Sequence, residues 1–369
     1  MTSAEPSRLD RVSIIGTGLI GTSVGLAAAR VGCTVTAWDA DAHTLATATG
    51  SGLMRAASSL VEAVRDAQVV VIATPIAAIP EQVEAALAAA PDAVVTDVGS
   101  IKSPLVIDVA LRTAVSARGR FVPGHPMGGS ERSGPNHASA ALVDGIVWVV
   151  TPTEASDPAM VDRLENWVTL LGARAVRMPP ERHDRLVAFV SHLPQVASTA
   201  LMALAATEEA DEPEILLLAA GGFRDLTRLA SSNPSLWSEI LLANGGQIAA
   251  AIDLYVARLT TLRDEILAGR GSEVEATFAG AKEARLKLAA KPQVRSGVAV
   301  LQVSVPDRPG ALALLTAVLA DGHVNIEDLQ IVHSPEGGRG TVHLTVAAGA
   351  VEEATQVLSA QGSDPIRIA

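Results

Sequence analysis

Up to Pro180, short apolar runs alternate along the chain with alanine-rich segments in which apolar residues recur at helical spacing. The apolar runs predict buried strands at Val12–Ile15, Thr34–Trp38, Val69–Ala73, Ala93–Asp97, Phe121–Pro123 and Ile146–Val150. Ser23–Val31 and Ile79–Ala90 have the spacing of helices that connect such strands. Strands that alternate with helices predict βαβ units and an α/β fold with a doubly wound parallel sheet.

Beyond Pro180 the pattern becomes helical, with few strand signals. The predicted helices are Arg182–Thr207, Pro213–Ala230, Pro234–Ala268 and Ser272–Leu288. Pro213 and Pro234 stand where a helix can begin, because the first turn does not need their missing N–H groups. Long helices with so much apolar surface favour an all-helical dimerisation domain, and hence a homodimer. A self-contained helical bundle is the alternative.

A further change of pattern lies near Lys291. Its predicted elements, in order, are strand Val298–Val305, helix Pro309–Asp321, strands Ile326–His333 and Thr341–Val346, helix Val351–Ala360 and a last strand Ile366–Ile368. The order βαββαβ is typical of a ferredoxin-like module. We therefore expect three domains, over residues 11–179, 180–291 and 297–369.

Composition excludes several classes of function. The 369 residues carry 28 Lys and Arg against 40 Asp and Glu, a net charge of −12, which argues against a nucleic-acid partner. Aromatic residues make up only 2% of the chain, so base-stacking platforms are not expected. The single cysteine, Cys33, excludes an intrachain disulfide and a cysteine-rich zinc site, and we expect no metal.

No membrane partner is expected either. The most apolar stretches, such as Val69–Ile79 and Ile215–Ala220, are short or interrupted, whereas a spanning helix needs roughly 20 apolar residues. Met1–Arg11 is charged and lacks the apolar core of a signal peptide. These features, with the lone cysteine, predict a cytoplasmic protein.

The first strand runs into a G-x-G-x-x-G turn followed by a helix, the context of a Rossmann-like dinucleotide site. Gly16 permits the tight turn, Gly18 allows a pyrophosphate to approach, and Gly21 lets helix and strand pack closely. Asp39, about 20 residues on, can accept hydrogen bonds from a ribose diol and would repel a 2′-phosphate, which favours NAD over NADP. A glycine-rich turn in an unrelated α/β domain is the alternative.

Two later strand ends should face the same ligand, since ligands of such sheets lie beyond the carboxyl ends of strands. Thr74 and Pro75 would face the inner ribose, and the segment Asp97–Ser100 would lie near the nicotinamide, although each can be a plain strand exit. The predicted cofactor-binding residues are Gly16, Thr17, Gly18, Leu19, Ile20, Gly21, Asp39, Thr74 and Pro75.

Histidine and arginine side chains mark the candidate chemistry. His125, in a polar loop after a strand, can accept a proton near neutral pH, although a lone histidine is more often structural. Arg224 and Arg228, four residues apart in a predicted helix, share a face among apolar residues, where a substrate carboxylate would fit the guanidinium fork. A structural ion pair with Asp225 or Glu239 is the equally weighted alternative.

Together these segments resemble a known family. The motifs GTGLIG, ATP, DVGSIK, HPMGGSERSG, HDRL…SHLP and GGFRDLTRLA…NPSLW resemble the TyrA family of prephenate and arogenate dehydrogenases over residues 11–291. The tail resembles an ACT domain, with a strand-to-helix loop at Asp307–Leu312 and a second segment at Asn325–Ile326.

The resemblance implies an oxidative decarboxylation of prephenate by NAD⁺ to 4-hydroxyphenylpyruvate, CO₂ and NADH, in tyrosine biosynthesis. It implies that His125 takes the proton of the ring hydroxyl, that Ser100 hydrogen-bonds both His125 and that hydroxyl, and that Arg228 binds a substrate carboxylate. The residues implied to line or gate the substrate pocket are Ser130, Glu131, His183, Ser191, His192, Gln195, Gly221, Arg224 and Trp237.

Some members of the family have a second histidine where this chain has Gln195, so arogenate stays open beside the preferred prephenate. A hydroxyacid dehydrogenase resembling 6-phosphogluconate dehydrogenase and a non-catalytic sensor are weaker alternatives. The ACT resemblance implies an amino-acid effector, with tyrosine preferred, and a purely structural dimerisation module is the alternative. The implied effector residues are Asp307, Pro309, Gly310, Ala311, Leu312, Asn325 and Ile326.

Overall fold

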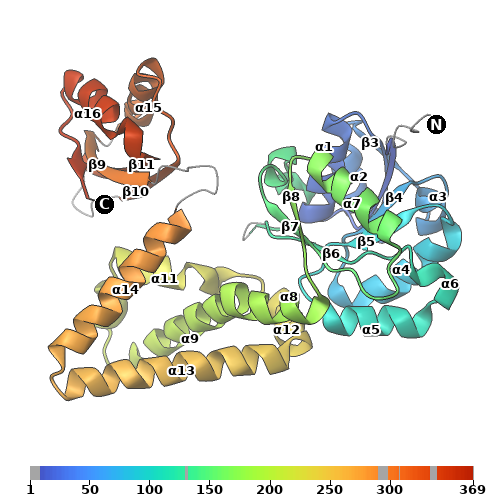
Figure 1. Cartoon of the computed structure of the whole chain (residues 1–369), viewed down its shortest axis with the longest axis horizontal. Helices are drawn as coiled ribbons and strands as arrows, with labels where there is room; N and C mark the ends of the chain where they lie inside the picture. Colours follow the sequence, from blue (N-terminus) through green and yellow to red (C-terminus); the bar gives the residue numbers. More distant parts are fainter. Residues whose placement is uncertain (1–8, 129–131, 290–297, 307, 333–338, 369) are drawn as a thin grey trace. The chain divides into compact units, whose positions relative to one another are not determined.

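The structure is a computed structural model that describes residues 9–128, 132–289, 298–306, 308–332 and 339–368 (Figure 1). The chain forms two compact units, Met1–Val256 and Ala257–Ala369.

The first unit begins with a five-stranded parallel sheet in the order β3-β2-β1-β4-β5 (Figure 1). Its strands are β1 (Arg11–Ile15), β2 (Thr34–Trp38), β3 (Met54–Ala56), β4 (Val69–Ile72) and β5 (Val94–Asp97). Its helices are α1 (Leu19–Arg30), α2 (Ala42–Thr49), α3 (Leu60–Val64), α4 (Ile79–Ala89), α5 (Ser103–Arg112) and α6 (Val115–Arg118), with a 3₁₀ turn η1 (Ile76–Ala78) before α4.

Successive residues of each strand point to opposite sides of this sheet, and helices cover both sides. Ile14 packs into the core that includes α1, whereas Ile15 packs into the core that includes α3 and α4. The chain reverses its winding between β1 and β4, the place where sheets of this kind bind ligands.

A second, three-stranded sheet contains β6 (Gly124–Pro126), β7 (Val147–Val150) and β8 (Arg174–Arg177). Helix α7 (Pro158–Leu170) lies between β7 and β8 in sequence, and the 3₁₀ turns η2 (Pro135–His137) and η3 (Ala140–Leu142) precede β7. Strand β6 runs antiparallel to β7, so the expectation of parallel strands throughout does not hold here.

The strand expected at Phe121–Pro123 begins later, at Gly124. Phe121 makes only an isolated bridge to Val95, and Pro123 has no N–H for a ladder. The carbonyl of Pro123 instead accepts a hydrogen bond from the backbone of Thr151.

The helical region consists of α8 (Pro180–Val187), a π turn η4 (Ala188–His192), α9 (Leu193–Glu208), α10 (Glu214–Leu217), α11 (Gly221–Thr227), a 3₁₀ turn η5 (Arg228–Ser231), α12 (Pro234–Ala243), α13 (Gly245–Leu267) and α14 (Gly271–Ala289). The long helices expected from spacing are therefore interrupted. The predicted helix Pro234–Ala268 bends by 92° at Asn244, which leaves helical geometry at φ −112°, ψ 25°.

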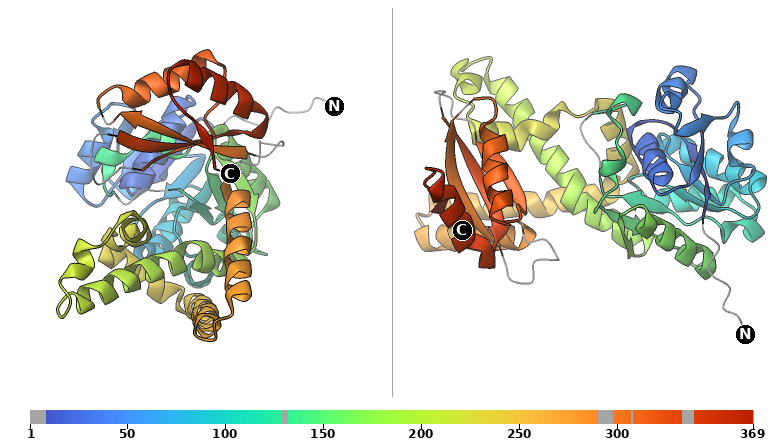
Figure 2. Two further views of the ribbon diagram at one scale, coloured as in Figure 1. Left: turned by 90° about the vertical axis from the view of Figure 1, so that its left-hand side faces the viewer. Right: turned by 90° about the horizontal axis from the view of Figure 1, so that it is seen from above.

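The C-terminal module has the order β9 (Val298–Pro306), α15 (Ala311–Asp321), β10 (Asp328–Val332), β11 (Arg339–Ala347), a 3₁₀ turn η6 (Ala348–Ala350), α16 (Val351–Ala360) and β12 (Ile366–Arg367). The predicted βαββαβ order is confirmed. Its antiparallel sheet runs β10-β11-β9-β12, and both helices cover one face of it (Figure 2).

By length and composition, the helical run Pro180–Glu208 is apolar enough to cross a bilayer, and so is the bent pair α12–α13. This corrects the expectation that no apolar run of that length exists. The run is nevertheless anchored in the first unit, because Asp184 accepts hydrogen bonds from the backbone N–H groups of Lys102 and Ser103 at the start of α5.

Candidate active site

The glycine turn after β1 has the geometry of a dinucleotide loop. Gly16 has φ +92°, and a Cβ there would lie 2.6 Å from the carbonyl oxygen of Ala73. A Cβ on Gly21 would lie 2.0 Å from the carbonyl oxygen of Gly16. Around Gly18 nothing lies within 4 Å of such an atom, so the loop is open where a pyrophosphate would approach.

Next to this loop lies a cavity of about 300 Å³, lined by Gly16, Gly18, Asp39, Ala40, Thr44, Ala73, Thr74, Pro75, Ala78 and Gln82. Of the predicted cofactor residues, Gly16, Gly18, Asp39, Thr74 and Pro75 belong to this lining. The others, Thr17, Leu19, Ile20 and Gly21, lie in the turn and the first turn of α1.

Asp39 is fixed at the end of β2 by the loop itself. Its Oδ2 accepts hydrogen bonds from the backbone N–H of Thr17 at 2.6 Å and from the Thr17 hydroxyl at 3.0 Å. Gly18, the N-cap of α1, contributes no side-chain cap, so N–H groups of the first turn remain for an anion. The residues present therefore fit a dinucleotide.

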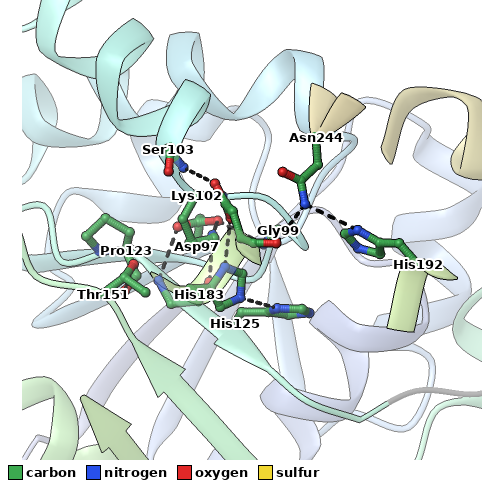
Figure 3. A network of polar contacts seen from close by, with 12 residues as sticks. Asp97, Gly99, Lys102, Ser103, Pro123, His125, Thr151, His183, His192 and Asn244 are labelled. Atoms are coloured by element: carbon green, nitrogen blue, oxygen red, sulfur yellow. Dashed lines mark hydrogen bonds and ion pairs between the residues drawn. The ribbon is translucent and has the colours of Figure 1, made fainter. Parts of the chain in front are cut away.

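A buried ion pair joins Asp97, at the end of β5, to Lys102, at the start of α5 (Figure 3). Lys102 donates from Nζ to Asp97 Oδ2 and, at 2.7 Å, to the carbonyl oxygen of Gly124; both charged side chains are 0% exposed. Asp97 Oδ1 also accepts the Gly124 N–H at 3.2 Å. The pair therefore clamps the beginning of β6. Burial lowers the pKa of Lys102, and the Asp97 carboxylate opposes that shift.

His125 stands in the middle of β6, immediately after this clamp. Its Nδ1 lies 2.8 Å from Nε2 of His183, and Nδ1 of His183 lies 2.8 Å from Oδ1 of Asp184 (Figure 3). Desolvation holds the pKa of His125 well below its ordinary value of 6.5, and the nearby His183, Lys102 and His192 lower it further. The ring is therefore neutral at pH 7 and able to accept a proton.

Asp184, on α8, connects several elements. Its Oδ1 accepts the Lys102 N–H at 2.8 Å, its Oδ2 accepts the Ser103 N–H at 2.7 Å, and its carbonyl oxygen accepts from Asn244 Nδ2 at 2.9 Å. Burial alone would raise the pKa of this carboxyl group. The hydrogen bonds from His183 and from the backbone of α5 outweigh that effect and lower it.

His192, at the end of the π turn, is the second buried imidazole near His125. Asn244 Nδ2 lies 3.3 Å from its Nδ1, and the Trp237 ring meets it edge-on at a centroid distance of 6.0 Å. Burial first, and then His183, lower the pKa of His192 to about 4, although Asp184 opposes the shift.

Two details of the expected site differ in the structure. Among the described residues no hydrogen bond joins Ser100 to His125, whose Nδ1 lies 2.8 Å from His183. Arg224 and Arg228 do not lie in one continuous α-helix, because α11 ends at Thr227 and Arg228 begins η5. Both arginines are exposed.

Gln195 is buried on α9 and has protein partners. Its Nε2 donates to the carbonyl oxygen of Leu229 at 2.8 Å, and its Oε1 accepts from the Ser232 hydroxyl at 3.3 Å. These bonds attach η5, which carries Arg228, to α9. Ser191 and Trp237 are half-buried, and Gly221 is exposed at the start of α11.

Three predicted residues, Ser130, Glu131 and Asp307, lie outside the described residues. In the predicted effector loop, Gly310 caps α15 with φ +87°, and Pro309, Ala311 and Leu312 flank it. Asn325 donates to Glu327 at 2.5 Å, and Ile326 is half-buried.

Sequence reasoning missed Lys102, Asp184 and Asn244 as parts of this network. Lys102 and Asp184 were visible only as letters of the motifs DVGSIK and HDRL. Asn244 carried no signal, because it comes into contact with His192 only through the bend between α12 and α13.

Three family profiles match the chain in order. The profile described as "Prephenate dehydrogenase, nucleotide-binding domain" matches residues 24–177, "Prephenate dehydrogenase, dimerization domain" matches 179–279, and "ACT domain" matches 299–364. These matches confirm the predicted kinds of domain, while the predicted boundaries stay predictions.

Characterised relatives agree. The prephenate dehydrogenase of Bacillus subtilis is 32% identical over 343 residues, covering 91% of this chain and 92% of the relative. The cyclohexadienyl dehydrogenase of Zymomonas mobilis is 30% identical over 291 residues, covering 77% of this chain and 98% of the relative.

Solved structures give the same result. Prephenate dehydrogenase from A. aeolicus, in complex with hydroxyphenyl propionate and NAD⁺, superposes with a TM-score of 0.71 at 26% identity, covering 77% of this chain and 100% of that one. Synechocystis arogenate dehydrogenase superposes with a TM-score of 0.66 at 28% identity, covering 75% and 99%. This chain belongs to the prephenate dehydrogenase family.

Proposed function

We propose that this chain is an NAD-dependent prephenate dehydrogenase that forms 4-hydroxyphenylpyruvate, CO₂ and NADH. The observation that carries the proposal is the neutral His125 imidazole, held on β6 by a buried ion pair in the same α/β unit as a dinucleotide loop. The loop, Asp39 and the lining of the adjacent cavity would hold NAD, which supplies the hydride acceptor when bound.

The chain's residues then move one proton. His125 accepts the proton of the substrate's ring hydroxyl as the hydride leaves the carbon that bears this hydroxyl. The bond from the ring to its carboxylate breaks, CO₂ leaves, and the electron pair completes the aromatic ring. His125 returns its proton to the phenolate oxygen, so atoms and charges balance.

Other residues bind the substrate in this proposal. Arg228 pairs with a substrate carboxylate, and Ser100 contacts the ring hydroxyl without bonding His125. The proposed pocket residues are Ser130, Glu131, His183, Ser191, His192, Gln195, Gly221, Arg224 and Trp237. The direct test is NADH formation by the full chain with NAD⁺ and prephenate, and no NADH above background would overturn the proposal.

Arogenate is the second candidate substrate, since the residue that differs from some relatives, Gln195, has its amide engaged by Leu229 and Ser232. An engaged amide contributes little to discrimination between a keto and an amino side chain. Comparing kcat/KM for prephenate and arogenate decides between them.

Asp39 should set the choice of cofactor. We expect Asp39→Ser to change the ratio of kcat/KM for NAD⁺ over NADP⁺ by about 10-fold or more in favour of NADP⁺, because a charged hydrogen bond to the ribose is lost and a repulsive charge is removed. Asp41→Ser, which alters a neighbouring exposed cap of α2, is the control. An unchanged ratio would mean that Asp39 does not contact the ribose.

Arg228 and Arg224 form a matched pair, since both are exposed and lie four residues apart. We expect Arg228→Ala to raise KM for prephenate by about 10- to 100-fold, the worth of a charge-assisted hydrogen bond, with KM for NAD⁺ nearly unchanged. Arg224→Ala should have the smaller effect on KM. Equal changes in both KM values for Arg228→Ala would indicate a structural role.

A homodimer in the cytoplasm is proposed as well. Large apolar side chains of the helical region are exposed, including Phe189, Val190, Leu204, Leu217, Leu218, Leu226, Leu242 and Leu254. Apolar surface of this extent is typical of a protein interface. The dimerization-domain match supports a second copy of this chain as the partner.

The C-terminal module is proposed to bind an amino-acid effector, with tyrosine preferred. A chain that ends after Lys291 should keep its dehydrogenase activity and lose any inhibition by tyrosine. Initial rates of the full and shortened chains, each with and without tyrosine, test this. Inhibition that persists in the shortened chain would place the effector at the active site.

A further inference from the structure

We propose that Asp184 is a positioning residue that sets opposite tautomers on His125 and His192, acting through His183 on the first and through Asn244 on the second. This inference rests on the proposed function only for its kinetic consequences. It changes the expected part played by His183, from a pocket residue to a link between Asp184 and the base.

The first link follows from donors and acceptors. An ionised carboxylate can only accept, so the proton of a neutral His183 lies on Nδ1, 2.8 Å from Asp184 Oδ1. Nε2 of His183 is then an acceptor, and the Nδ1 of His125, 2.8 Å away, must carry the proton between them. The Nε2 of His125 is left with a free lone pair, as a base requires.

Asp184 is well placed to remain ionised, because the buried Lys102 cation lies close enough to interact with its charge. Its carboxylate receives the backbone N–H groups of Lys102 and Ser103, which are the N-cap and first residue of α5. The positive end of a helix stabilises a negative charge at this position. The carboxylate therefore has hydrogen-bond donors besides the ring of His183.

The second link uses the other end of the same residue. The carbonyl oxygen of Asp184 can only accept, so it fixes the orientation of the Asn244 amide, whose Nδ2 lies 2.9 Å away. The second hydrogen of that nitrogen faces Nδ1 of His192 at 3.3 Å. Nδ1 of His192 is thereby the acceptor, and its Nε2 carries the proton.

The two imidazoles, both positioned by Asp184, thus differ at Nε2: His125 has a lone pair there and His192 has an N–H. On a hydroxylated carboxylic acid, the hydroxyl can give its proton to His125, and an oxygen that needs a donor can accept from His192. When His125 becomes protonated, its Nδ1–H keeps its bond to His183, and the Asp184 carboxylate stabilises the charge from behind.

Asp184→Asn tests the first link. The amide of Asn can donate to Nδ1 of His183, which moves the proton of His183 to Nε2. That Nε2–H then donates to Nδ1 of His125, so the proton of His125 moves to Nε2 and this atom is no longer free to accept. We expect kcat to fall by at least about 10²-fold, with NAD⁺ affinity unchanged. Asp108→Asn, an exposed carboxylate on α5, is the matched control and should keep wild-type kcat.

The decisive measurement is ¹⁵N NMR of the full-length protein with labelled histidine, without substrate, at pH 7. We expect a proton on Nδ1 of His125 and on Nε2 of His192, and the reverse on His125 in Asp184→Asn. An imidazolium at His183, a bare Nδ1 on His125, or wild-type kcat in Asp184→Asn overturns the inference. If the variant does not fold, the wild-type spectrum still decides. Absence of NADH formation by wild-type protein would count against the proposed function alone.

Discussion

Replacing His125 with Asn lowers kcat for prephenate by at least about 10²-fold, because general-base catalysis contributes about 10²- to 10⁴-fold. Asn fills a similar volume at the centre of β6 but cannot take up a proton. His125 is not among the residues that line the cavity beside the dinucleotide loop, so the dissociation constant for NAD⁺ should stay near the wild-type value. Steady-state kinetics and NAD⁺ titration measure the two quantities separately.

The matched control for this variant is His323→Asn, which changes an exposed histidine of the C-terminal module at a φ of 53° that Asn tolerates. It should leave kcat unchanged. The pH profile gives a second check, because the lowered pKa of His125 puts the acid limb of kcat/KM well below pH 6.5. A near-wild-type rate for His125→Asn would rule out the proposed base.

Lys102→Met should be the most destabilising of the substitutions considered. It leaves the fully buried Asp97 without its counter-charge. It also removes the hydrogen bond that Lys102 donates to the carbonyl oxygen of Gly124. Breaking one partner of a buried pair costs about 3–5 kcal/mol. Urea unfolding can follow it through tryptophan fluorescence, because Trp148 and Trp167 are buried in the same α/β unit.

Two comparisons make this prediction specific. Lys282→Met, at an exposed lysine of α14, should leave the unfolding midpoint unchanged. The double variant Asp97→Asn/Lys102→Met removes both buried charges and should recover part of the lost stability. If Lys102→Met unfolds at the wild-type midpoint, the pair does not hold β6 in place.

Sequence patterns predicted those parts of the fold that depend on local periodicity. The strand Thr34–Trp38 and the helix Val351–Ala360 have the predicted bounds, and the glycine turn has the geometry that its spacing indicated. Where short-range patterns and tertiary contacts agree, spacing is sufficient.

The rest depended on contacts between distant residues. Asp184 meets Lys102 across 82 positions of sequence, and Asn244 meets His192 across 52. No periodicity reports such pairs. Among the described residues no hydrogen bond joins Ser100 to His125, the pairing that the resemblance implies; His183, 58 positions away, lies instead 2.8 Å from Nδ1 of His125.

The π turn Ala188–His192 has a consequence for how this site can vary. His183 and His192 are nine positions apart, about 2.5 turns of a regular α-helix, which would put them on opposite sides of the helix. The wider turn shifts the phase, so both rings are buried near His125. A π turn holds one more residue than an α turn, so the nine positions here correspond to eight of a regular helix and bring the two rings to within about 80° of each other. Deleting one residue within Ala188–His192 should therefore give a regular α-helix that keeps both histidines on the same side, whereas inserting one residue should rotate His192 away from His183.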